Sequence, residues 1–173
     1  MKPVALTIAG SDPSGGAGLQ ADLKTFHQFG VYGVSAVTVL TVQNTVEVSS
    51  VDPLDPEYVR KQLEAVTSDI PPQAGKTGAL GTAEITDVVA IWARQHTCPL
   101  VVDPVMISKH GVPLLSEAAR LSLVEKLLPL AVLVTPNLAE AAALTGRDVC
   151  SLDEMREAAR QIADLGPGAV LIK

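Results

Sequence analysis

The fold of this chain is decided by the stretch Val4-Ala-Leu-Thr-Ile-Ala-Gly-Ser-Asp-Pro-Ser-Gly-Gly-Ala-Gly18-Leu-Gln-Ala-Asp-Leu-Lys-Thr-Phe26. An apolar, β-branched run from Val4 to Ile8 stops at Gly10, a loop of Gly, Ser, Asp and Pro follows, and an amphipathic segment begins near Gly18. This order predicts a strand, a glycine-rich loop and a helix. Enzymes of the α/β class use that arrangement to present backbone N–H groups to an anionic or polar ligand.

Two well-known glycine loops fit this stretch poorly. A Walker A loop needs Lys-Ser/Thr after its second glycine, but Gly16-Ala17 follows Gly15 here. A dinucleotide fingerprint is formally met by Gly16, Gly18 and Ala21, yet the predicted strand ends some six residues before Gly16. Gln43 also stands where an acid should bind the ribose. The pattern therefore disfavours an NAD-dependent dehydrogenase. That alternative predicts that the protein binds NAD.

Composition limits the class of protein. The 173 residues suffice for one domain, and with 47% apolar but only 3% aromatic residues the core must consist of Val, Leu, Ile and Ala, as in buried parallel sheets. A net charge of −6 argues against nucleic acid or an anionic membrane as a partner. The sequence shows no membrane-spanning apolar run and no signal peptide, so we expect a cytoplasmic protein. Cys98 and Cys150 do not have the spacing of metal ligands, and we expect both to be reduced thiols.

Short apolar runs alternate with segments of helical periodicity, which predicts repeated strand–helix units within a single domain, 1–173. Ser116 and Ser151 are expected to cap helix starts, and Gly30 and Gly146 helix ends. The alternating segment 46–51 predicts a short extra strand or flap. The expected strands are 3–9, 34–42, 74–77, 99–103, 130–134 and 168–172, and the expected helices are 19–29, 55–68, 83–96, 116–128, 137–145 and 152–165.

Polar residues follow each expected strand at the point where it ends. In a parallel sheet these carboxyl ends share one edge, where ligands bind in open α/β folds. We therefore expect a site at this edge, although loops are polar in any protein. The residues at the six ends are Gly10-Ser11-Asp12, Gln43-Asn44-Thr45, Lys76-Thr77-Gly78, Asp103-Pro104, Thr135-Pro136-Asn137 and Lys173.

Four segments carry a resemblance to a known family. Residues 9–18 with 20–25, Val42-Gln-Asn-Thr45, Val102-Asp-Pro-Val-Met106 and Thr135-Pro-Asn-Leu-Ala-Glu140 resemble segments of the hydroxymethylpyrimidine/phosphomethylpyrimidine kinases of thiamine biosynthesis. That family has a ribokinase-like fold. The resemblance implies a three-layer α/β fold with a mainly parallel central sheet, a small pyrimidine substrate, ATP and Mg²⁺ as cofactors, and a homodimer.

The resemblance places the pyrimidine near the first and second strands. It implies that Gly10, Asp12, Ala17 and Asp22 line the substrate side, and that Gln43 holds the pyrimidine. A glutamine amide can accept from an exocyclic amine and donate to the neighbouring ring nitrogen, as it does with adenine. Two alternatives stay open: Gln43 could cap a turn, and Asp22 could be a first-turn acid favoured by the helix dipole.

The third and fourth similar segments supply the expected nucleotide side. Hard Mg²⁺ takes one or two carboxylates plus phosphate oxygens, so Asp103 and Glu140 are the candidate metal ligands, with Asn137 beside them at a helix start. Glu140 could instead be only the third-position acid of a capping box. Lys109 and Lys173 are candidates for nucleotide phosphate contact, or else solvated surface lysines. For Lys76 the alternatives are a place on the pocket floor and a structural role.

One family signature is not found. Related kinases carry a glycine-rich turn, roughly G-T-G-C-T, that forms an anion hole and supplies the catalytic base, whereas the sequence here ends at Val170-Leu-Ile-Lys173. We therefore expect a C-terminally incomplete kinase, about two-thirds of a family member, with little or no activity by itself. A pyridoxal kinase and a non-catalytic pyrimidine-binding module are the alternatives.

Overall fold

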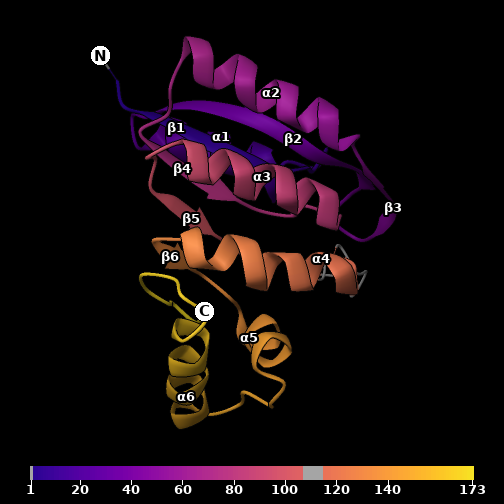
Figure 1. The fold of residues 1–173 in the computed structure, drawn as a ribbon. Helices are drawn as coiled ribbons and strands as arrows, with labels where there is room; N and C mark the ends of the chain where they lie inside the picture. Colours follow the sequence, from indigo (N-terminus) through magenta and orange to yellow (C-terminus); the bar gives the residue numbers. More distant parts are fainter. Residues whose placement is uncertain (1, 107–114) are drawn as a thin grey trace.

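The computed structural model describes residues 2–106 and 115–173. Its strands form one six-stranded sheet of order β3-β2-β1-β4-β5-β6, in which only β3 runs antiparallel to its neighbour (Figure 1). The expected mainly parallel sheet is thus confirmed. The strands are β1 (Val4–Ser11), β2 (Tyr32–Gln43), β3 (Val48–Pro53), β4 (Ala74–Thr77), β5 (Leu100–Val102) and β6 (Leu133–Val134).

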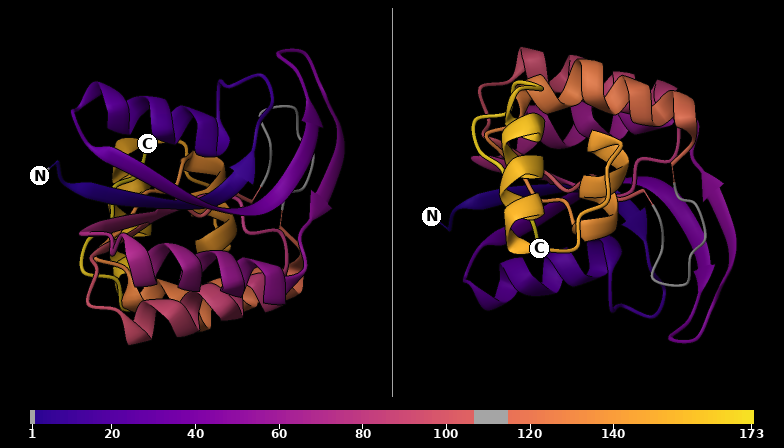
Figure 2. Two further views of the ribbon diagram at one scale, coloured as in Figure 1. Left: turned by 90° about the horizontal axis from the view of Figure 1, so that it is seen from above. Right: turned by 90° about the horizontal axis from the view of Figure 1, so that it is seen from below.

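Helices cover both faces of this sheet (Figure 2). Helix α1 packs on β1 and β2 from one side, while α2, α3 and α4 pack side by side on the other. Helices α5 and α6 pack against each other at the β6 end. The helices are α1 (Gly18–Gln28), α2 (Pro56–Asp69), α3 (Ala83–Gln95), α4 (Glu117–Ser122), α5 (Leu138–Thr145) and α6 (Leu152–Ala163).

Successive side chains of each strand point to opposite faces of the sheet, and this alternation separates the apolar core from the polar groups of the site. Leu6 and Ile8 of β1 are fully buried in the main hydrophobic cluster, together with Leu63 of α2 and Ile85 of α3. Thr7, between them in sequence, faces α1 and donates a hydrogen bond to Asp22. Polar side chains of the parallel strands can therefore face the α1 side while the opposite face forms the apolar core.

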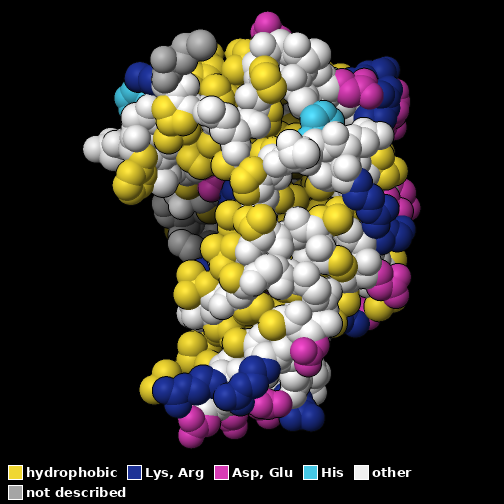
Figure 3. Space-filling model, turned by 60° about the vertical axis from the view of Figure 1, so that its left-hand side comes forward, with side chains coloured by type: hydrophobic (Ala, Val, Ile, Leu, Met, Phe, Trp, Pro, Cys, Tyr) yellow, Lys and Arg dark blue, Asp and Glu magenta, His cyan; other side chains and the backbone are white. Residues whose placement is uncertain are grey.

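Local signals fix most helix boundaries as the sequence predicts. Ser116 and Ser151 accept N-cap hydrogen bonds from Ala119 N and Glu154 N, and Gly146 ends α5 in the left-handed conformation. Trp92, buried in α3, donates through Nε1 to Thr67 of α2 over 3.0 Å. The exposed side of α6 carries ion pairs one turn apart, and acidic and basic side chains are intermixed at that end of the molecule (Figure 3).

Two expected elements are wrong in part. The helix expected over 116–128 changes after Ser122 to a π-helical turn (Leu123–Leu127) and a 3₁₀ turn (Leu128–Leu130), where Pro129 lacks an N–H, so β6 starts only at Leu133. The strand expected over 168–172 reduces to one bridge between Val170 and Val134. Backbone hydrogen bonds still join the two segments: Gly168 N donates to Ala131 O, Val134 N to Ala169 O and Leu171 N to Val134 O.

The short strand or flap expected over 46–51 is confirmed as β3, which forms a hairpin with β2. None of the helices within the described ranges is long and apolar enough to cross a bilayer.

Gly18 joins the loop to α1 at a position with no room for a side chain. Its φ is +56°, and a Cβ there would lie 2.4 Å from the carbonyl oxygen of Gly10. Gly30 has a similar φ of +72°, but no described atom lies within 4 Å of its Cβ position. We predict that Gly18→Ala lowers the free energy of unfolding by about 3 kcal/mol, since backbone strain and overpacking add.

The matched control is Gly30→Ala, which introduces only the backbone strain and should cost about 1 kcal/mol. Urea unfolding of both variants measures the difference. Equal losses of stability in the two variants would show that the close approach of Gly18 to Gly10 is not a constraint on the fold.

Candidate active site

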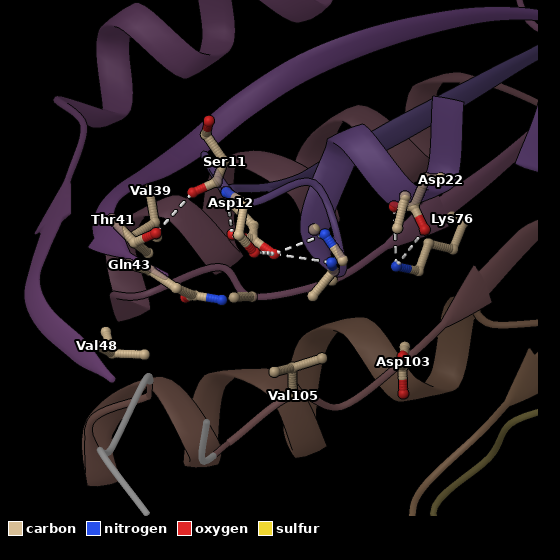
Figure 4. A pocket seen from close by; sticks show the side chains of 18 of the residues that line it. Ser11, Asp12, Asp22, Val39, Thr41, Gln43, Val48, Lys76, Asp103 and Val105 are labelled. Atoms are coloured by element: carbon tan, nitrogen blue, oxygen red, sulfur yellow. Dashed lines mark hydrogen bonds and ion pairs between the residues drawn. The ribbon is translucent and has the colours of Figure 1, made fainter. Parts of the chain in front are cut away.

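A cavity of about 480 Å³ lies at the carboxyl edge of the parallel strands (Figure 4). Gln43 and Asp103 lie toward opposite ends of it. The structure thus brings every sequence-predicted site residue to one cavity, apart from Lys109, which lies outside the described residues. The predicted residues that line the cavity are Gly10, Asp12, Ala17, Asp22, Gln43, Asp103, Asn137, Glu140 and Lys173.

The glycine-rich loop is folded around its own carboxylate. Asp12 Oδ1 accepts from Ser14 N over 2.8 Å, and Oδ2 accepts from Gly16 N and Ala17 N over 3.1 and 2.8 Å. Burial alone would raise the pKa of Asp12, but hydrogen bonds from the Ser14 hydroxyl and from these three backbone N–H groups outweigh it and lower the pKa. The expectation that these loop amides face a ligand is therefore wrong for Ser14, Gly16 and Ala17, because Asp12 already fills the anion position.

A side-chain network ties this loop to β2. Gln20 Oε1 accepts from Asp12 N over 2.8 Å, and Gln20 Nε2 donates to Ser11 Oγ over 2.7 Å. Thr41 of β2 donates to the carbonyl oxygen of Ser11 over 2.8 Å. The loop is thereby held in register with the end of β2.

Gln43 is the last residue of β2, and its side chain lines the cavity. Its amide makes no hydrogen bond with any described residue. The turn that follows is held instead by Asn44, whose Oδ1 accepts from Val46 N and Glu47 N over 2.8 and 2.9 Å. Among the described residues Gln43 therefore caps no turn, contrary to the turn-capping alternative, and its side chain faces the cavity.

Asp22 lies beyond the first turn of α1, so it is not the first-turn acid considered as an alternative. Its Oδ2 accepts from Thr7 Oγ1 over 2.6 Å. Lys76 Nζ of β4 lies 3.1 and 3.0 Å from Oδ1 and Oδ2 of the same carboxylate, as drawn in Figure 4. The side chains of Lys76 and Asp22 are 24% and 18% exposed. The wall of the cavity beside α1 therefore holds a partly buried ion pair.

The far end of the cavity combines two carboxylates with one lysine. Asp103 Oδ1 accepts from Lys173 Nζ over 2.8 Å, and from Thr135 Oγ1 over 3.3 Å. Glu140 and Asn137 form a capping box: Glu140 Oε2 accepts from Asn137 N, and Asn137 Oδ1 accepts from Glu140 N. Glu140 thus caps α5, and it also lines the cavity.

The environment of Glu140 disfavours its charge. Burial is the main cause that raises its pKa, and the nearby charge of Asp103 raises it further. Hydrogen bonding from Asn137 N and the charge of Lys173 act in the opposite direction without cancelling the effect. Two carboxylates that repel each other beside a cavity suit a divalent cation.

Comparison with known proteins assigns the family. A family model described as phosphomethylpyrimidine kinase matches residues 12–173. The chain belongs to the phosphomethylpyrimidine kinase family. Two hydroxymethylpyrimidine/phosphomethylpyrimidine kinases of this family, from Synechococcus elongatus and Bacillus subtilis, are 52% and 46% identical to it over 171 and 170 residues. These alignments cover 99% and 98% of this chain, which spans 65% and 63% of the two relatives.

Solved structures place the chain in the same fold. A Clostridium difficile phosphomethylpyrimidine kinase has a TM-score of 0.91 at 47% identity, covering 99% of this chain and 75% of that one. A Staphylococcus aureus pyridoxal kinase in complex with AMP-PCP and pyridoxal has a TM-score of 0.90 at 40% identity, covering 100% and 62%. The expected ribokinase-like α/β fold of the phosphomethylpyrimidine kinase family is confirmed.

Some lining residues of this phosphomethylpyrimidine kinase family member were not predicted from its sequence. Thr41 and Val105 line the cavity two residues away from Gln43 and Asp103, on the same side of the chain. The two-residue period of extended chain is a signal that could have identified both. Val48 also lines the cavity, but it does so from β3, and only the pairing of the hairpin places it there.

The raised pKa of Glu140 leads to a stability prediction. A raised pKa means that the folded protein holds the proton more tightly than the unfolded chain, so ionisation of Glu140 costs stability. This cost is absent below the unfolded pKa, taken as 4.5, and fully present above the folded pKa. In buffer with EDTA, we expect Glu140→Gln to gain stability over the wild type as the pH rises from 4.5, measured by urea unfolding.

Glu154 is the matched control because it closes the second capping box, with Ser151, in an exposed position. Hydrogen bonds from Cys150 N, the Ser151 hydroxyl and Ser151 N lower its pKa. Glu154→Gln should therefore lose stability relative to the wild type above pH 4.5 and regain it as the pH falls through the folded pKa. The same pH trend in both variants would contradict the assignment of burial as the dominant cause at Glu140.

Proposed function

We propose that this chain forms the substrate and metal–nucleotide site of a kinase that phosphorylates 4-amino-5-hydroxymethyl-2-methylpyrimidine and its monophosphate with Mg–ATP in thiamine biosynthesis. One observation carries the proposal: the amide of Gln43 and the carboxylates of Asp103 and Glu140 face the same cavity. The names of its relatives support the substrate class, and the AMP-PCP and ADP in related structures support an adenine nucleotide.

The substrate end of the cavity suits a flat heterocycle with both donors and acceptors. The Gln43 amide accepts from the exocyclic amine and donates to the adjacent ring nitrogen. Asp22 accepts from a second donor of the substrate on the opposite wall, and Val39 and Val48 contact the ring as apolar neighbours. Gly10, Asp12 and Ala17 shape the edge of this pocket, with the Asp12 carboxylate acting on the loop rather than on the ligand.

The nucleotide end fits Mg²⁺ by the chemistry of its donors. Among the described residues no cluster of three or more His, Cys, Asp or Glu side chains could form an all-protein metal cage. Two carboxylates are sufficient for Mg²⁺, which keeps several waters and takes its remaining ligands from phosphates. Asp103 and Glu140 would hold the ion, which when bound neutralises phosphate charge and orients the phosphate chain.

The remaining groups of this end act on the nucleotide by charge and hydrogen bonding. Lys173 holds Asp103 over 2.8 Å and is placed to meet a phosphate as a point charge. The Asn137 Oδ1 is engaged in the capping box, which leaves its side-chain N–H₂ group for the nucleotide. These residues bind and orient; the base that takes the proton of the attacking hydroxyl is not among them.

A pyridoxal kinase is the second candidate. It is favoured by the Staphylococcus aureus pyridoxal kinase in complex with pyridoxal, which has a TM-score of 0.91 at 41% identity. The amide of Gln43 favours the aminopyrimidine, since that amide pairs with an amine beside a ring nitrogen. We further propose that the protein is a cytoplasmic homodimer without nucleic-acid or membrane partners, in keeping with its net charge of −6.

The role of Gln43 can be tested by substitution with methionine, which keeps the length but removes both hydrogen bonds. We expect Gln43→Met to weaken binding of the hydroxymethylpyrimidine about 10- to 100-fold, since a two-point amide contact is worth about 1–3 kcal/mol. Affinity for Mg–AMP-PCP should be unchanged. Isothermal titration calorimetry of the purified protein with each ligand measures both effects.

Asp103→Asn is the reciprocal control and should weaken Mg–AMP-PCP while sparing the pyrimidine. Tighter binding of pyridoxal than of the pyrimidine would establish the second candidate. Pyrimidine binding with no response to Mg–AMP-PCP would indicate a non-catalytic binding module. If Gln43→Met binds the pyrimidine as tightly as the wild type, the proposed contact between the Gln43 amide and the pyrimidine is wrong, and the proposal loses its main support.

A further inference from the structure

The ion pair between Lys76 and Asp22 links two elements of the cavity wall. Lys76 lies on β4 and Asp22 on α1, 54 residues apart in sequence. Thr7 of β1, fully buried, donates to the same carboxylate over 2.6 Å. Two donors from neighbouring strands therefore fix one carboxylate on the helix above them.

The hydrogen bonds leave one side of this carboxylate available. Asp22 Oδ2 accepts from both Thr7 Oγ1 and Lys76 Nζ, whereas Oδ1 accepts only from Lys76 Nζ among the described residues. A carboxylate oxygen can accept two hydrogen bonds. Oδ1 therefore keeps one acceptor position, and Asp22 lines the cavity.

Stability alone is a weak reason for this pair. Moving a lysine and an aspartate out of water costs free energy that their attraction only partly repays. The protein also contains a closely similar arrangement away from the cavity, where Asp87 accepts from Lys126 Nζ and from the Ser122 hydroxyl. Asp87 and Lys126 are 38% and 43% exposed, about twice as much as Asp22 and Lys76. The pair beside the cavity is thus the one that is withdrawn from water.

Glycine at position 78 leaves space beside the ammonium group. A Cβ at Gly78 would lie 3.3 Å from Lys76 Nζ and 3.0 Å from Ala9 Cβ. A side chain at position 78 would therefore crowd both the Lys76 ammonium group and β1. Lys76 is the only cation that the described residues place on Asp22.

We propose that Lys76 is a positioning residue, which holds the Asp22 carboxylate in one orientation so that Oδ1 accepts a hydrogen bond from an amine or hydroxyl of the substrate. The proposal rests on the proposed function for the identity of that substrate. Lys76 also lines the cavity, but in this proposal it acts on the ligand through Asp22 and not by direct contact. Thr7 fixes the other oxygen, so that the carboxylate cannot rotate about its axis.

A double-mutant cycle tests this division of roles. The variants are Lys76→Met, Asp22→Asn and the two combined, and the probe is 4-amino-5-hydroxymethyl-2-methylpyrimidine, titrated by calorimetry. We expect Lys76→Met to weaken binding about tenfold or more, since hydrogen bonds to charged groups are among the stronger ones. In the Asp22→Asn background, Lys76→Met should have no further effect.

Three controls accompany the cycle. Lys76→Arg keeps the positive charge, so this variant should keep most of the wild-type affinity for the pyrimidine. Lys126→Met breaks the similar Asp87 pair and should leave pyrimidine affinity unchanged. Thermal unfolding of each variant confirms that the protein remains folded. If Lys76→Met lowers pyrimidine affinity equally in the wild-type and Asp22→Asn backgrounds, Lys76 contacts the ligand itself and the proposal is overturned. The proposal is also overturned if Lys76→Met changes the affinity in neither background.

A ligand-free crystal structure of Lys76→Met separates this proposal from the proposed function. We expect the Asp22 side chain to leave the position that it has here or to occupy more than one rotamer. An Asp22 carboxylate that stays in place on Thr7 without the lysine would overturn the positioning role whatever the protein binds. Failure of the wild-type protein to bind the pyrimidine would instead overturn the proposed function.

Discussion

The parallel alignment of β1, β2, β4, β5 and β6 is the constraint on which the site depends. Parallel strands must all end at the same edge, so the residues that follow them are brought together although they lie far apart in sequence. The strand order also reverses at β1, between β2 and β4, and this is where the cavity opens. Gln43, Lys76 and Asp103 share a cavity because their strands share a direction.

Internal pairing decides which polar groups at this edge can serve a ligand. Asp12 lines the cavity, but its carboxylate accepts hydrogen bonds from the amides of Gly16 and Ala17 and so stabilises the loop. Asp22 and Asp103 each hold one lysine. In a chain of net charge −6, two of the acids at this edge are thus locally compensated, which is what the proposed phosphorylated ligand requires. The amide of Gln43 makes no hydrogen bond with a described residue, in keeping with its proposed role toward the heterocycle.

Much of this architecture could be predicted from sequence because its signals are local. The strand predicted at 74–77 has those bounds in the structure, and Ser151 and Gly146 mark helix ends by their own chemistry. Whether 168–172 forms a regular strand depends instead on its neighbour, β6, which it meets in one bridge and several backbone hydrogen bonds. Such dependence between elements is not visible in a local pattern.

The candidate site shows the same division. Strand ends identified which residues gather at the cavity, but whether a donor is free depends on its three-dimensional partners. The loop amides are occupied because Asp12 folds back onto them, although an Asp two residues before Ser14 is a known turn signal. Lys76 could not be assigned from sequence, since its partner Asp22 is 54 residues away.

The most direct test of the shared edge is a crystal structure of the protein with the hydroxymethylpyrimidine, Mg²⁺ and AMP-PCP bound together. The account predicts the pyrimidine against Gln43 and Asp22, and the metal-bound phosphates beside Asp103 and Glu140, within the one cavity. Either ligand bound away from the carboxyl ends of the parallel strands would contradict it.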